Sequence, residues 1–294
     1  MNLSAPSTEA VAAARIENAD LTVVGGGGHV GIPLVLAFAE AGFRVNVHDV
    51  DREVIETLRS GRLPFIEFGG EDLLTRALAR KRLVFTSKPP EISPGAPVII
   101  TIGTPVDEFH NPMRNVIADC VDALLPHLHE GQLLVLRSTV FPGTTEWIDS
   151  HLKRKGRSLK LAFCPERVVQ GSGIKELKET PQIISGTTQE AEQEAAKLFA
   201  PITCERVIVT PREAEFAKLF NNAYRYIEFA IANQFYLISK SAGLDYRRIA
   251  HAMKHNFPRA RACSSRPGRE FNRRATALPR PRETISPSAH SLQP

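Results

Sequence analysis

Three glycines at fixed spacing are the first residues of this sequence that could do chemistry. Gly26, Gly28 and Gly31 form a G-x-G-x-x-G pattern directly after the apolar run 20–24, and Asp49 ends the next such run. At a strand-to-helix junction, these glycines let backbone N–H groups approach a diphosphate, and the helix N-terminus favours negative charge. The Asp49 carboxylate would accept hydrogen bonds from a ribose and repel a 2′-phosphate. The pattern predicts binding of NAD rather than NADP; a purely structural glycine-rich turn is the alternative.

Neighbouring residues would complete this site. His29 and Val30 lie inside the glycine pattern, and we expect His29 at the solvent edge under the cofactor rather than in a catalytic role. Arg52 follows Asp49 closely and, with Arg44, slightly weakens the preference for NAD, since a guanidinium attracts a phosphate.

Polar residues also follow three later apolar runs, at the edge where an open α/β sheet binds its ligand. A single threonine there is more often a turn or N-cap residue, so the repeated placement carries the functional interpretation. The residues concerned are Thr104 and Pro105, Ser138 and Thr139, and the carboxylate Glu166 with Arg167 beside it.

Lys218 and Asn222 are four residues apart in a segment with helical spacing. Residues at i and i+4 share one helix face, so the two side chains could stabilise an oxyanion together. The alternative for this pair is a surface lysine beside an exposed asparagine. The alternative for Glu166 is an ion pair with Arg167.

Apolar runs of strand length alternate with helical segments, which predicts an α/β fold with a doubly wound, Rossmann-type parallel sheet. We expect a flexible leader over 1–18, an NAD-binding domain over 19–210, a helical central segment over 211–257 and a disordered tail over 258–294. Expected strands are 20–24, 44–48, 83–86, 98–102, 133–136 and 159–163, and expected helices are 28–41, 51–60, 71–80, 116–128, 144–155 and 189–199.

From 213 to 242 no glycine or proline interrupts a pattern of apolar residues at helical spacing. This predicts a helix of about 30 residues ended by Gly243, with a second helix over 245–255. A helix of that length packs between domains or subunits, so we expect a homodimer.

Composition excludes several classes of protein. Of 294 residues, 43% are hydrophobic and 23% charged, and no apolar run approaches the roughly 20 residues of a membrane span. We find no export signal, and the four scattered cysteines form no metal-binding or disulfide pattern, so we expect a cytoplasmic protein without a metal. The net charge of +5 arises in the arginine-rich tail, which has no interleaved aromatics, so nucleic-acid binding is not expected.

Five motifs in order resemble the UDP-glucose/GDP-mannose 6-dehydrogenase family, and the T-P-V-D-E and S-T-V-x-P-G-T-T motifs argue against a β-hydroxyacid dehydrogenase. Within the family, C-P-E-R and the run 222–225 look more like the UDP-N-acetylhexosamine (UDP-N-acetylmannosamine or UDP-N-acetylglucosamine) branch. The motifs are Gly26–Pro33, Thr104–Glu108, Ser138–Glu146, Cys164–Arg167 and Lys218–Asn222.

The resemblance implies an NAD-dependent, two-step oxidation of a sugar C6 alcohol to a uronate for polysaccharide synthesis. A cysteine would hold the aldehyde as a thiohemiacetal and then as a thioester. Lys218 and Asn222 would stabilise the oxyanion, and Glu166, with Thr139, would handle the proton of the attacking water. The implied substrate contacts are Glu166, Arg167, Val168, Lys218, Asn222 and Arg225.

The resemblance ends near Arg259. The family continues with a G-x-C-x-x-x-D pattern and a second α/β domain that covers the UDP, and we expect this C-terminal domain to be absent, since 260–294 has no such pattern. Cys263 lacks the flanking glycines and aspartate. The abrupt change to Arg, Pro and Ser is what an out-of-frame continuation would produce. The alternative function is therefore a catalytically inactive NAD-binding fragment without nucleophile or substrate lid.

Overall fold

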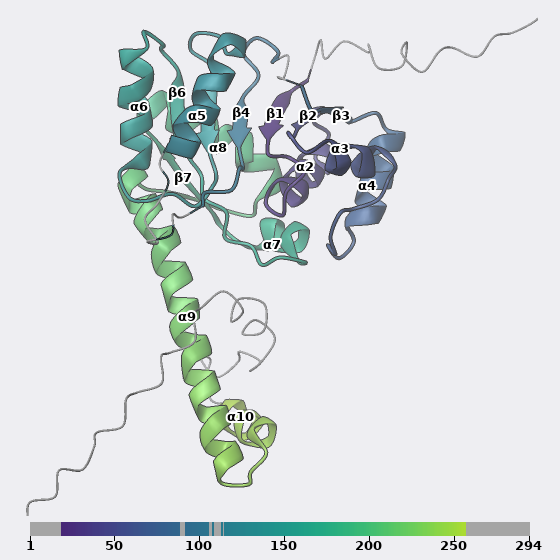
Figure 1. Cartoon of the computed structure of the whole chain (residues 1–294), viewed down its shortest axis with the longest axis vertical. Helices are drawn as coiled ribbons and strands as arrows, with labels where there is room; N and C mark the ends of the chain where they lie inside the picture. The colour runs from purple at the N-terminus through teal and green to yellow at the C-terminus, as the bar shows by residue number, and fades with distance from the viewer. Residues whose placement is uncertain (1–18, 89–91, 106–107, 109–112, 114, 257–294) are drawn as a thin grey trace, which may run out of the picture. The chain divides into compact units, whose positions relative to one another are not determined.

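An eight-stranded sheet forms the centre of the first part of the chain (Figure 1). The computed structural model describes residues 19–88, 92–105, 108, 113 and 115–256. The strand order is β3-β2-β1-β4-β5-β6-β7-β8, and all neighbours pair in parallel except β6 and β7, which are antiparallel. The strands are β1 (Leu21–Val24), β2 (Val45–His48), β3 (Leu83–Thr86), β4 (Val98–Ile100), β5 (Leu133–Leu136), β6 (Lys160–Phe163), β7 (Gln182–Gly186) and β8 (Arg206–Ile208).

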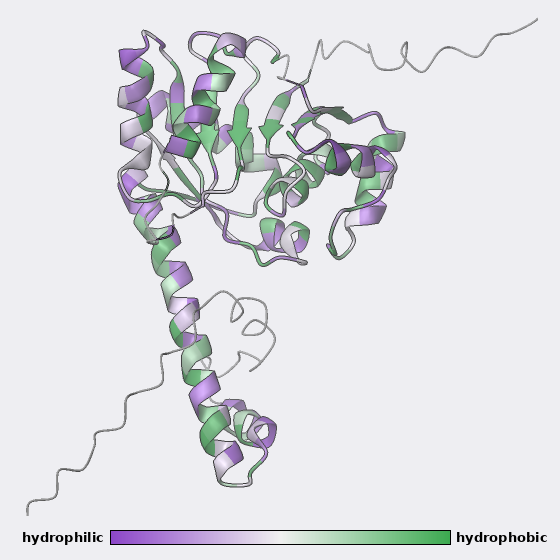
Figure 2. Ribbon diagram, in the orientation of Figure 1, coloured by the Kyte–Doolittle hydropathy of each residue, from purple (hydrophilic) through white to green (hydrophobic). Residues whose placement is uncertain are grey.

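Helices cover both faces of this sheet. They are α2 (Gly31–Glu40), α3 (Arg52–Arg59), α4 (Gly70–Ala79), α5 (Asn115–Leu124), α6 (Thr144–Arg154), α7 (Gly173–Glu179) and α8 (Gln189–Phe199), with short 3-10 turns at Leu125–His127 and Ala200–Ile202. Hydrophobic residues concentrate on the strands and hydrophilic ones on the outer helices (Figure 2).

Alternation along each strand builds two core layers. Leu133 and Val135 of β5 pack with α2 and α8, whereas their neighbours Leu134 and Leu136 pack with α5 and α6. Because successive side chains of a strand point to opposite faces, an unbroken apolar run fills both layers. This explains why the central strands contain almost no polar residues.

The Rossmann-type fold expected from the sequence is confirmed. The expected strands agree with β1 to β6 within two residues at each end, but three elements were not expected: α7, β7 and β8. The sheet is parallel as expected apart from β7, which runs antiparallel to β6. The helix expected from residue 28 begins at Gly31, because residues 25–30 form the glycine-rich turn.

The long helix α9 (Pro211–Ser241) and the shorter α10 (Tyr246–Lys254) follow the sheet, close to the expected 213–242 and 245–255. Contacts divide the chain into two compact units with a boundary between Asn221 and Asn222, inside α9. In the second unit the rings of Tyr236 and Tyr246 meet edge to face, with centroids 6.1 Å apart.

Several expectations fall outside the described residues. These are the leader 1–18, the tail from 257 with Cys263, and part of Thr104–Glu108. Within the described residues, no helix is long and apolar enough to cross a membrane, and no group of three or more His, Cys, Asp or Glu residues could hold a metal ion.

Candidate functional site

The turn after β1 contains glycines with two different roles. A Cβ on Gly31 would lie 2.4 Å from the Gly25 carbonyl oxygen and 2.6 Å from the Gly26 Cα, so only glycine allows this close crossing. Gly28 is different, because it is exposed and its nearest neighbour would be 3.5 Å away. Its lack of a side chain leaves room on the outer side of the turn, which suits a diphosphate.

Asp49 is fixed against this turn. One carboxylate oxygen accepts a hydrogen bond from the Gly27 N–H at 3.0 Å, and the other accepts from the Asp51 N–H at 3.1 Å. Helix α2 begins at Gly31 without a side-chain cap and without an acidic residue in its first turn. Uncapped N–H groups beside a clamped carboxylate suit the diphosphate and ribose of a dinucleotide, so these residues fit NAD.

The other residues expected around the cofactor lie near the same turn. His29 is exposed, and its ring contacts that of Phe65 at a tilt of 35°, with centroids 3.9 Å apart. Val30 is half-buried directly before α2, and Arg52 is exposed as the first residue of α3. The roles of His29, Val30 and Arg52 in cofactor binding stay predictions.

Hydroxyl groups join the loops that follow neighbouring strands. The Thr104 hydroxyl donates to the Thr139 carbonyl oxygen at 2.6 Å, and the Ser138 hydroxyl donates to the Ile102 carbonyl oxygen at 2.6 Å. The buried Thr101 hydroxyl lies 2.9 Å from the carbonyl oxygens of both Val24 and Gly25. Thr104 and Ser138 therefore join the loops after β4 and β5, and Thr101 joins the residue after β4 to the end of β1. Pro105, which follows Thr104, is exposed.

Glu166 and Lys218 meet beyond the end of β6. The Lys218 Nζ lies 3.3 Å from Glu166 Oε2, and the side chains are only 9% and 13% exposed. Glu166 also accepts a hydrogen bond from the N–H of Val168, two residues later, which closes a local turn at the end of C-P-E-R. The structure thus brings together two residues, expected independently, that are 52 positions apart. Glu166 pairs with this lysine; Arg167 instead donates to the Pro181 carbonyl oxygen.

Asn222 and Arg225 belong to the second compact unit. Asn222 is half-buried one helical turn after Lys218 on α9, and Arg225 is exposed. The Arg225 guanidinium carbon lies 6.0 Å from the Phe229 ring centroid, in cation–π range. The roles of Asn222 and Arg225 stay predictions.

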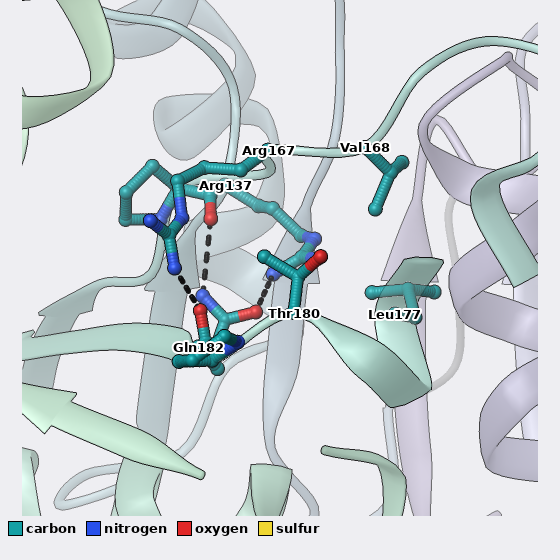
Figure 3. Close-up of a pocket in the computed structure, with 8 residues that line it drawn as sticks. Arg137, Arg167, Val168, Leu177, Thr180 and Gln182 are labelled. Atoms are coloured by element: carbon teal, nitrogen blue, oxygen red, sulfur yellow. Dashed lines mark hydrogen bonds between the residues drawn. The ribbon is translucent and has the colours of Figure 1, made fainter. Parts of the chain in front are cut away.

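A buried arginine was missed by sequence reasoning. Arg137 is 1% exposed; its Nη1 donates to the Cys164 carbonyl oxygen at 3.1 Å and to Gln182 Oε1 at 2.9 Å. The Gln182 Nε2 donates in turn to the Pro165 carbonyl oxygen at 3.0 Å (Figure 3). These hydrogen bonds fix the backbone carbonyl groups of Cys164 and Pro165, the two residues before Glu166. Burial lowers the pKa of Arg137, whereas the charge of Glu166 raises it.

Two further buried carboxylates position the loops around the site. Glu215 on α9 accepts from the backbone N–H groups of Gly143 at 2.5 Å and Thr145 at 2.8 Å, at the start of α6. Glu67 accepts from the N–H groups of Gly171 and Ile174, both at 3.1 Å, at the start of α7. Nothing local in the sequence indicated these partners, which are 70 or more residues away.

The three described cysteines differ in burial and therefore in the reactivity of their thiols. Burial raises the pKa of the Cys120 thiol to about 11 and that of Cys164 to about 12, so neither is a thiolate at neutral pH. Cys204 is exposed and donates to the Glu179 carbonyl oxygen at 3.4 Å.

Comparison with known proteins agrees with this geometry. Residues 19–203 match the NAD-binding domain of the UDP-glucose/GDP-mannose dehydrogenase family, and residues 212–271 match its central domain. The chain is 32% identical to a UDP-N-acetyl-D-mannosamine dehydrogenase of Methanococcus aeolicus, over 82% of this chain and 55% of that protein.

Two solved structures are similar to this chain. The UDP-N-acetyl-mannosamine dehydrogenase of Staphylococcus aureus is 26% identical with a TM-score of 0.71, covering 84% of this chain and 60% of its own. A UDP-glucose dehydrogenase of Pyrobaculum islandicum is 28% identical with a TM-score of 0.72, covering 82% and 58%. The chain thus spans little more than half the length of these relatives. With an NAD-binding domain matched over most of its length, it belongs to the UDP-glucose/GDP-mannose dehydrogenase family.

Proposed function

We propose that this chain binds NAD and carries the acid–base part of a nucleotide-sugar 6-dehydrogenase, which oxidises a C6 alcohol to the uronate. The single observation that carries this proposal is the pairing of Lys218 and Glu166 at 3.3 Å, nearly out of solvent. Strands β1, β4, β5 and β6 are mutually parallel, so Glu166 after β6 and the glycine turn after β1 lie at one edge of the sheet.

The chemistry follows from the charges of these two residues. Bound NAD would supply a hydride acceptor. The Lys218 ammonium would stabilise negative charge that develops on the C6 oxygen, because a positive charge in a site of low exposure acts more strongly than in water. Glu166 would take or return the proton of a water molecule. The Val168 N–H and the Arg137–Gln182 pair would hold the carboxylate in place.

For the substrate we propose a UDP-N-acetylhexosamine such as UDP-N-acetylmannosamine. Support comes from the C-P-E-R segment, which with the next residue, Val168, flanks the site, and from the relatives named UDP-N-acetyl-D-mannosamine dehydrogenase. Arg225 is the residue we propose for the substrate phosphate or N-acetyl group. The alternative is an NAD-binding remnant, which rests on the lack of a G-x-C-x-x-x-D pattern in 260–294.

We further propose a homodimer formed through α9. Within the second unit, large apolar side chains recur at spacings of three and four residues, which makes one apolar helix face. They are exposed by 37% to 62%: Tyr224, Ile227, Ile231, Phe235 and Ile238. A cytoplasmic location remains the expectation from composition.

One experiment with two stages tests the proposal. Calorimetric titration of NAD into the chain should give saturable binding, and addition of UDP-N-acetylmannosamine with NAD should then produce NADH. UDP-glucose and GDP-mannose serve as comparison substrates. Binding without NADH formation for any sugar would support the remnant; absence of NAD binding would overturn both.

A further inference from the structure

The pocket beside Arg137 has features that the proposed oxidation does not use. It lies between the loop after β6 and the end of α7, and its labelled lining residues are Arg137, Arg167, Val168, Leu177, Thr180 and Gln182 (Figure 3). The space accommodates about one group the size of a water molecule. A pocket this small cannot hold a sugar or a nucleotide.

The Arg137 guanidinium presents an unused donor. Its Nη1 is occupied by Gln182 and the Cys164 carbonyl, but its Nε, which is fully buried, has no hydrogen-bond partner among the described residues. The Phe199 ring covers the guanidinium, with its centroid 5.2 Å from the guanidinium carbon. A buried charged donor without a partner is costly, so an acceptor at this position would stabilise the fold.

The charge balance around the pocket favours an anion over a neutral acceptor. The partners of Arg137 are uncharged, and the Arg167 guanidinium lies on the other side of the Gln182 amide (Figure 3). Glu166 is the carboxylate whose field reaches Arg137, and it is already paired with Lys218. The guanidinium groups of Arg137 and Arg167 therefore line the pocket. Glu166 is the one carboxylate of the described residues near three cations, which are these two arginines and Lys218.

We propose that this pocket binds a chloride-sized monovalent anion, held by Arg137 Nε with Thr180 at its rim. A guanidinium is weakly hydrated, and Val168 and Leu177 add apolar surface to a lining that also contains Gln182. Such surroundings suit a monovalent halide, which loses little hydration on entry, better than a doubly charged oxyanion. The proposed anion is distinct from NAD and from the nucleotide sugar, and it would lie beside the backbone of the Cys164–Glu166 segment.

Thermal unfolding without NAD or sugar tests this proposal. At constant ionic strength, replacing gluconate by chloride or bromide should raise Tm by about 2 °C with saturation; sulfate is too large and should not give a saturable shift. Arg137→Lys keeps the positive charge but has no Nε–H in that position, and Thr180→Val removes the hydroxyl. Both variants should lose most of the halide-dependent shift.

Arg157→Lys is the matched control, because Arg157 also donates to two backbone carbonyls but lies away from the pocket. It should keep the full halide shift. Crystals soaked in bromide should show an anomalous peak within hydrogen-bond range of Arg137 Nε. The proposal would be overturned if Arg137→Lys showed the same halide-dependent shift in Tm as the parent chain. It would also be overturned if the bromide-soaked crystals showed only water in the pocket and no anomalous peak. Neither result bears on NAD binding.

Discussion

Lys218 Nζ on α9 lies 3.3 Å from Glu166 Oε2 at the end of β6, and both side chains are at most 13% exposed. This contact joins the long helix to the loop that carries C-P-E-R. The start of α9 is fixed in the same unit by Glu215, whose carboxylate receives the N–H groups of Gly143 and Thr145. Glu215 thus fixes the position of the helix segment that carries Lys218. A lysine that stabilises a developing charge needs such a fixed position.

Lys218→Met should abolish most oxidation without abolishing NAD binding. Loss of a charge aimed at the developing oxyanion should lower the rate of NADH formation by about 10²- to 10³-fold. Glu166 would lose its cation, so we also expect destabilisation by about 1–3 kcal/mol. NADH absorbance, calorimetry with NAD and urea unfolding measure the three quantities. Lys240→Met, at an exposed position of α9, should change none of them. An unchanged rate in Lys218→Met would remove Lys218 from the mechanism.

Gly28→Ala and Gly31→Ala should separate cofactor binding from folding. At Gly28 the added methyl has room, so the free energy of unfolding should stay within about 1 kcal/mol, while the methyl obstructs the diphosphate and weakens NAD binding about ten-fold. At Gly31 the methyl would lie 2.4 Å from a carbonyl oxygen, so stability itself should fall. Equal NAD affinity in Gly28→Ala and the parent chain would contradict the assigned path of the diphosphate.

Asp49→Ser should shift the preference between NAD and NADP. The carboxylate is clamped by the N–H groups of Gly27 and Asp51, so it cannot swing away from a 2′-phosphate. Removing its charge should reduce the ratio of NADP to NAD dissociation constants by about ten-fold, since like charges at close range repel. Calorimetric titration with each cofactor measures the ratio. Asp51→Ser is the control, because it removes a neighbouring carboxylate while serine can still cap α3. An unchanged ratio would exclude Asp49 as the selective residue.

The sequence predicted the first six strands because each is an unbroken apolar run that fills two core layers. It did not predict β8, because Arg206–Ile208 is short and exposed on both faces. It also missed α7, whose seven residues are too few for a periodic pattern and whose first turn is stabilised by Glu67 from a distant segment.

The site was predictable to the extent that its residues follow strand ends or share a helix face. Glu166, Lys218 and the glycine turn meet those conditions. Arg137 does not, because a charged residue after a strand is normally exposed. Its burial depends on Gln182, 45 residues later, and on the ring of Phe199. Such a partnership arises only when β5, β7 and α8 are assembled.

Alkylation at neutral pH should modify Cys204 and spare Cys120 and Cys164. The thiolate is the reactive form, and burial raises the pKa of the other two thiols to about 11 and about 12. Peptide mapping by mass spectrometry after treatment with iodoacetamide distinguishes the sites, and urea-unfolded protein, in which all three react, is the control. NAD binding should survive alkylation. Rapid modification of folded Cys164 would show that the loop after β6 opens readily, contrary to its complete burial.

Ile227→Glu together with Ile231→Glu should convert a dimer into a monomer. The two side chains are 58% and 37% exposed on the apolar face of α9, and carboxylates there would have to be buried unpaired when two copies pack together. Light scattering after size-exclusion chromatography should give twice the chain mass for the parent protein and the single chain mass for the variant. Lys240→Glu, at an exposed position on the opposite side of α9, should leave the dimer intact. A parent chain that is monomeric at all concentrations, with its apolar face open to water, would rule out the proposed assembly.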